Sequence, residues 1–118
     1  MNALHLSGGT IATQIYGDGI KLDGGTSSVE LNGGLISTTQ NATGIDIING
    51  TNTITLSSGQ ISLGQAGTGL LIGGGNNTFT MTGGSIYSVD SGQNIQNYGN
   101  AIIVNGGTTT FNISGGSL

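Results

Sequence analysis

Side chains that could carry out acid–base or metal chemistry are few in this chain of 118 residues. Five carboxylates stand against one lysine and one histidine, and the sequence contains neither arginine nor cysteine. General acid–base catalysis needs two tuned groups at one place, and thiolate chemistry needs cysteine. Because the carboxylates are dispersed, we predict no enzyme, no catalytic residues, no metal site and no cofactor. The acidic residues are Asp18, Asp23, Glu30, Asp46 and Asp90.

The charge balance also excludes two classes of partner. A formal net charge of −4 with a single basic side chain, Lys21, leaves nothing to neutralise the phosphates of a nucleic acid. No stretch approaches the run of about 18 apolar residues that a membrane-spanning helix needs. We therefore expect neither nucleic-acid binding nor membrane insertion of this segment.

The elements that must position these side chains are strands, because one alternating segment recurs along the chain. Residues 4–11 read LHLSGGTI, and related segments begin near residues 29, 54, 79 and 111. The first three steps are 25 residues long and the fourth is 32. Apolar and polar residues alternate in each copy, which is typical of strands with one buried face, and glycines supply the corners.

A second recurring segment lies between these copies. It reads GIKL at 19–22, GIDI at 44–47, GLLI at 69–72 and AIIV at 101–104. A third recurring element is a single apolar residue shortly after the glycine turn, which is Ile36 in the second copy. The extra seven residues of the long step fall within residues 87–100. Loops that project from a repeat array often carry binding groups, so Tyr87, Asp90, Asn94 and Tyr98 are candidates for a contact loop, although a tolerated insertion without a role explains them as well.

Short strands at a fixed spacing favour a parallel β-helix, in which each turn stacks on the previous one about 4.8 Å away. We predict an all-β single domain over residues 1–118, with about 4.5 turns of a 25-residue repeat, three short strands per turn and almost no helix. Equivalent apolar residues should form inward columns: Leu4, Val29, Ile54, Phe79 and Phe111; Leu6, Leu31, Leu56, Met81 and Ile113; Ile11, Ile36, Ile61, Ile86 and Leu118; Ile20, Ile45, Leu70 and Ile102; Leu22, Ile47, Ile72 and Val104.

The same register predicts outward ladders of polar residues. It places Thr53 beside Thr78 and Thr55 beside Thr80, and it brings His5 over Glu30 and Lys21 over Asp46. The apolar columns and strand edges at both ends look uncapped. Since solenoids need polar caps for solubility, we expect a fragment of a longer protein that self-associates through these ends.

The recurring Leu-x-x-Gly-Gly-x-Ile, with Gly-Ile-x-Ile and a Gly-Gly-Thr turn, resembles the passenger region of bacterial autotransporter adhesins, over essentially the whole chain. This resemblance to the pertactin-like β-helix implies a right-handed winding. It also implies secretion, display at the outer membrane and bacterial cell surface, and a role as a virulence-associated adhesin or stalk. An adhesin of this kind would bind a ligand on a host surface or on a neighbouring cell.

The leading hypothesis is therefore a non-catalytic structural or adhesive segment of a surface-displayed passenger. Two alternatives remain open. Thr-x-Thr pairs on neighbouring turns suit an ice-binding β-solenoid, and a groove with clustered carboxylates would indicate a carbohydrate-binding or carbohydrate-processing β-helix fibre.

Overall fold

The computed structural model describes residues 1–88 and 99–118, which form β-strands and turns and contain no helix. The strands are short because glycine-rich corners separate most of them. They are β1 (Asn2–Leu6), β2 (Thr10–Ala12), β3 (Asp18–Leu31), β4 (Leu35–Ser37), β5 (Thr43–Leu56), β6 (Gln60–Leu63), β7 (Thr68–Ile72), β8 (Asn76–Met81), β9 (Ser85–Ser88), β10 (Asn100–Val104) and β11 (Thr108–Ile113).

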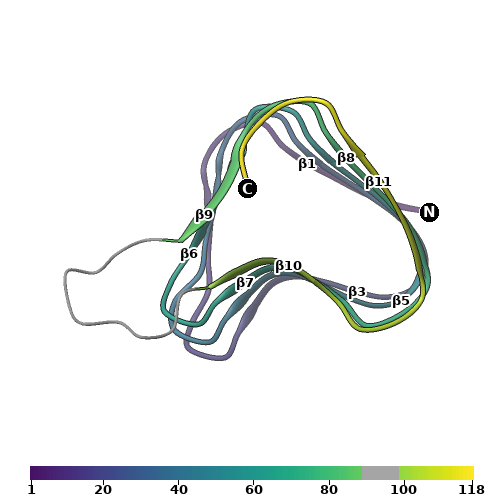
Figure 1. Ribbon diagram of the computed structural model, residues 1–118, viewed down its shortest axis with the longest axis horizontal. Helices are drawn as coiled ribbons and strands as arrows, with labels where there is room; N and C mark the ends of the chain where they lie inside the picture. The colour runs from purple at the N-terminus through teal and green to yellow at the C-terminus, as the bar shows by residue number, and fades with distance from the viewer. Residues whose placement is uncertain (89–98) are drawn as a thin grey trace.

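Every pairing between these strands is parallel, and each strand pairs with one from the next passage of the chain around the molecule. One sheet has the order β1-β3-β5-β7-β10, with β8 joined to β5 and to β11, and a second sheet has the order β2-β4-β6-β9. Figure 1 shows successive coils lying over one another around a common interior. The fold is a parallel β-solenoid of about three turns.

Equivalent residues of the recurring segment lie side by side in the sheet. Leu4 pairs with Val29, and Val29 pairs with Ile54. The column continues through Phe79 to Phe111, whose rings are 5.9 Å apart between centroids. In this column apolar residues therefore stack on apolar residues from coil to coil, which buries one face of each strand of the middle coils.

The expectation of three separate strands per turn is wrong for the first two coils. β3 and β5 each run for 14 residues and cover both the GIKL or GIDI segment and the following alternating segment. Glycines with positive φ, such as Gly25 at 71° and Gly50 at 101°, bend the strand while pairing resumes at Thr26 with Thr51. At this corner the pairing of β3 with β5 shifts register twice, between Leu22 and Thr26. Only the later coils divide here, into β7 and β8 and into β10 and β11.

The core fills the interior with aliphatic side chains, as expected for the middle coils. The predicted inward residues of these middle coils, from Val29 through Ile86, are buried. Ala42 and Leu63 are also buried, and the period-2 pattern did not identify them. At the end coils the inward columns lose their cover on one side. Exposed members are Leu4, Val104, Phe111, Ile113 and Leu118.

Candidate functional site

The outer side of the sheet formed by β3, β5, β8 and β11 presents hydroxyl groups in a regular array. The structure brings the four predicted threonines together, with Thr53 paired to Thr78 and Thr55 paired to Thr80. These residues are exposed or half-buried, whereas the intervening Ile54 and Phe79 point into the core. This array is called the hydroxyl face below. The coils have a roughly triangular outline in Figure 1, and the hydroxyl face lies on the side where β1, β8 and β11 are labelled.

The hydroxyl face contains a third outward column that was not among the predicted ladders. Thr26 pairs with Thr51, Thr51 with Asn76, and Asn76 with Thr108. The run Thr-x-Thr-x-Thr at 51–55 is the sequence signal for this column, since it extends the polar alternation one step before the residue that precedes Ile54. With this column the face comprises Thr26, Ser28, Thr51, Thr53, Thr55, Asn76, Thr78, Thr80, Thr108 and Thr110.

Charge on this side of the molecule is confined to one edge. The predicted pairing of His5 with Glu30 is confirmed, with His5 Nδ1 2.8 Å from Glu30 Oε2. Both side chains are well exposed, at 68% and 39%, so this contact contributes little to stability. Along residues 51–56 of β5 and along β8 and β11 the outward positions are uncharged. The hydroxyl face is thus a neutral surface on an acidic protein.

Three of the carboxylates are less dispersed than their sequence positions predict. Asp18, Asp23 and Asp46 lie close enough on β3 and β5 for their charges to interact. Burial raises the pKa of Asp46 above its usual 3.8; Asp18 and Asp23 raise it further, and Lys21, its predicted neighbour, opposes the shift. No trio of His, Asp or Glu in the described part of the chain could hold a metal ion.

A buried polar ladder runs beneath the hydroxyl face. Asn52 donates from Nδ2 to the carbonyl of Asn49 and to Asn77 Oδ1 at 2.9 Å. Asn77 repeats this pattern one coil later, donating to the carbonyl of Gly74 and to Thr109 Oγ1. Asn52 Oδ1 is buried without a hydrogen-bond partner. The ladder ties each corner to the next coil, which is a structural role rather than a chemical one.

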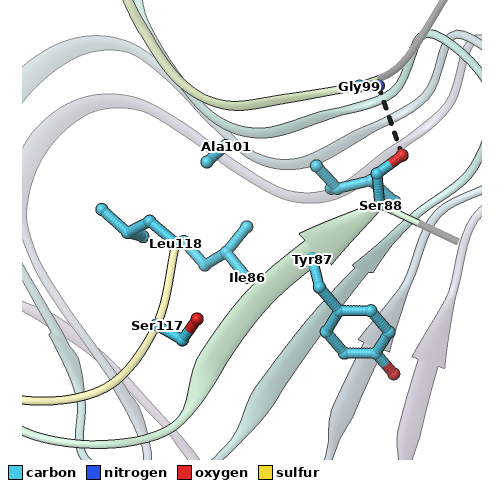
Figure 2. Close-up of a pocket in the computed structure, with 8 residues that line it drawn as sticks. Ile86, Tyr87, Ser88, Gly99, Ala101, Ser117 and Leu118 are labelled. Carbon is cyan, nitrogen blue, oxygen red and sulfur yellow. Dashed lines mark hydrogen bonds between the residues drawn. The ribbon is translucent and has the colours of Figure 1, made fainter.

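Of the predicted contact loop, only Tyr87 falls in the described structure; Asp90, Asn94 and Tyr98 lie outside it. Tyr87 is 40% exposed at the end of β9. It borders a cavity of about 300 Å³, but Figure 2 shows its ring directed away from the group formed by Ile86, Ala101 and Leu118. Besides Tyr87 and Gly99, the described residues that line the cavity are aliphatic residues and two serines, and they include no acid–base pair.

Fold and surface together place this chain among the parallel β-solenoids. No protein-family model matches the sequence, and comparisons with curated proteins and with solved structures return no match. No helix in the described residues is long and apolar enough to cross a membrane.

Proposed function

We propose that this chain is a non-catalytic structural and adhesive segment of a surface-displayed, autotransporter-like passenger. The observation that supports this most is the continuous parallel stacking of residues 51–56 with β8 and β11, in which threonine-rich columns outside and apolar columns inside run from coil to coil. Such a stack makes a stiff rod with a repetitive surface and needs no disulfide or metal. The resemblance of the recurring glycine pairs to adhesin passengers adds a bacterial cell-surface location and a ligand on a host or neighbouring cell.

Surface display tests this proposal. The chain, fused ahead of an outer-membrane transport barrel in a non-adherent bacterium, should reach the cell surface and increase attachment to cultured host cells. Thr53→Lys with Thr78→Lys should abolish the increase because charges interrupt the hydroxyl face. Gln60→Lys, an exposed position on the other sheet, is the matched control and should preserve it. Attachment equal to that of the bare barrel would contradict an adhesive role.

The proposed repeat unit is 25 residues in a right-handed solenoid of about 4.5 turns, interrupted by seven residues within 87–100. Pairings such as Val29 with Ile54 before the interruption and Leu70 with Ile102 after it support this unit. The apolar side chains exposed at the end coils support self-association, with Phe111 and Ile113 covered by a second molecule. Light scattering that gives the monomer mass at high concentration would contradict self-association.

Ice binding is a second candidate, and the third column of the hydroxyl face favours it. Outward residues repeat about 4.8 Å apart between strands and about 6.6 Å apart along each strand, on a neutral parallel sheet. A flat lattice of methyl and hydroxyl groups with these spacings can order water into rows, which is the chemistry of an ice surface. Glu30 and Asn112 limit the array to its central strands.

Thermal hysteresis measures ice binding directly. If the hydroxyl face binds ice, the chain depresses the freezing point below the melting point, Thr53→Tyr removes the gap, and Gln60→Tyr leaves it intact. Absence of hysteresis at high concentration of the folded chain would eliminate ice binding. The carbohydrate-processing alternative has less support because the cavity beside Tyr87 is not lined by Asp18, Asp23 or Asp46.

A further inference from the structure

Three asparagines in the described chain precede a glycine, and their surroundings differ. These are Asn32, Asn49 and Asn105, all with exposed side chains. Asn49 alone has the following backbone amide against its own side chain, since Gly50 N–H donates to Asn49 Oδ1 at 2.8 Å. We propose that Asn49–Gly50 is a site of self-modification, where the corner of β5 converts asparagine to aspartate and isoaspartate faster than the other two sites.

The reaction needs only the chain and water. The backbone nitrogen of Gly50 attacks Cγ of Asn49, forming an N–Cγ bond and a five-membered succinimide. The Cγ–Nδ2 bond breaks, and ammonia leaves with the proton that Gly50 gives up. Water then opens the ring at either carbonyl, giving aspartate or isoaspartate. A flexible chain loses conformational entropy when it brings this nitrogen to the side-chain amide. Here the two groups are already in contact, so most of that entropy cost is absent from the barrier.

The structure explains why this corner is held in place. Gly50 has a φ of 101°, a conformation that side-chain-bearing residues rarely adopt, and an added Cβ would lie 2.6 Å from the carbonyl oxygen of Gly25. The buried Asn52 donates to the carbonyl of Asn49 and thereby closes the turn. The backbone is thus fixed while the Asn49 side chain stays in solvent, where water can open the ring.

The other two dipeptides lack this arrangement. Asn32 Oδ1 accepts hydrogen bonds from Ser57 Oγ at 3.2 Å and from Ser58 Oγ at 3.3 Å, which tie its side chain to the next coil. At Asn105 no side-chain hydrogen bond is found among the described residues, so nothing there directs the side chain to the amide of Gly106. The same dipeptide therefore occurs in three settings within one molecule.

Modification would act where the sheet is already irregular. Asn49 is the register partner of Asp23, at a shift in the pairing of β3 with β5. Aspartate at this position sets two carboxylates side by side in a chain whose formal charge is already −4. Isoaspartate also inserts one extra carbon into the backbone and so lengthens the corner.

Peptide mapping of the whole chain, aged at mildly alkaline pH, tests the proposal. Mass spectrometry follows conversion at each of the three asparagines, and enzymatic methylation of isoaspartate provides a second readout. The chain unfolded in urea supplies the reference, because there the three dipeptides lose their structural differences. Folding should raise the ratio of conversion at Asn49 to that at Asn32 about tenfold.

Two results would overturn this inference: equal conversion of the three sites in the folded chain, or slower conversion at Asn49. Asn49→Gln serves as the matched variant. Its longer side chain disfavours the five-membered ring, so the aged sample should lose most of its acidic species on ion exchange while Asn32 and Asn105 behave as before. Unchanged acidic species in Asn49→Gln would place the modification elsewhere.

Discussion

At the residue scale, three tight corners adopt the same left-handed backbone with different side chains. Tyr16, Asn41 and Ala66 have φ values of 62°, 54° and 55°. The corners are linked from coil to coil, since the Tyr16 amide donates to the carbonyl of Gln40 and the Asn41 amide to that of Gln65. Asparagine tolerates this conformation through local hydrogen bonding of its short side chain, whereas alanine and tyrosine gain no such relief.

Ala66→Asn should therefore stabilise the protein by about 1 kcal/mol, because it removes part of the cost of the left-handed conformation. Urea denaturation followed by circular dichroism measures this free energy of unfolding. The reciprocal change, Asn41→Ala, should destabilise by a similar amount. If both variants unfold at the urea concentration of the parent chain, the corners are not strained as described.

Asp46 provides a residue-scale prediction on pH. Because its folded pKa is raised above 3.8, chiefly by burial, its contribution to stability is fully present below 3.8 and is lost as pH rises through the folded value. Asp46→Asn removes this loss and should stabilise the chain at neutral pH, with a gain that disappears below pH 3.8.

Chemical denaturation at several pH values provides the measurement. Asp18→Asn is the control. Of the two neighbouring carboxylates, Asp18 raises the pKa of Asp46 more than Asp23 does, so its removal should lower that pKa while Asp46 still titrates. A destabilised Asp46→Asn at neutral pH would mean that the attraction to Lys21 outweighs burial and the neighbouring carboxylates.

At the scale of the elements, the recurring glycine pairs and alternating apolar residues were sufficient to predict parallel strands, their partners and most of the core. The bend that keeps β3 and β5 continuous was not predictable, because positive φ at Gly25 allows a corner without ending the pairing. The burial of Leu63 was not predicted, because the sequence pattern marked only Ile61 in this strand, whereas β6 continues to Leu63. The third threonine column was missed because polar residues carry no burial signal.

The close approach of strands at the GIDI-type segments depends on glycine. A Cβ at Gly44 would lie 2.7 Å from the carbonyl oxygen of Gly69 and 3.0 Å from Ile61 Cγ2. Gly44→Ala should therefore cost about 1–3 kcal/mol through overpacking. Gly8→Ala is the control, as a Cβ there meets nothing within 4 Å. Equal thermal unfolding of the two variants would show that the coils are not so closely stacked.

The buried ladder beneath the hydroxyl face predicts a stabilising change. Ser27 pairs with Asn52 in the sheet, and Asn52 Oδ1 has no partner. Ser27→Asn would extend the ladder by one coil and satisfy this oxygen, adding about 1 kcal/mol to the free energy of unfolding. Ser28→Asn, on the outer face, should be nearly neutral. Denaturation midpoints would contradict the ladder if Ser27→Asn unfolds earlier than the parent chain.

At the scale of the whole molecule, each coil contacts its neighbours along several columns, so the stack should unfold as one unit. Charge and hydroxyl groups are segregated on this stack: Asp18, Asp23 and Asp46 mark one side and the neutral hydroxyl face marks another. The proposed adhesive or ice-binding roles both use the neutral side. Both depend on the same claim, that coils lie over one another in the 25-residue register.

Engineered disulfides test that register most directly, because the chain contains no cysteine of its own. Thr55 and Thr80 are register partners, so their Cα atoms should be about 4.8 Å apart, within the range a disulfide spans. The pair Thr55→Cys with Thr80→Cys should close rapidly under mild oxidation. The diagonal pair Thr55→Cys with Thr78→Cys, about 8 Å apart, should stay reduced. Closure of the diagonal pair at the same rate, or of neither, would contradict the stacked solenoid.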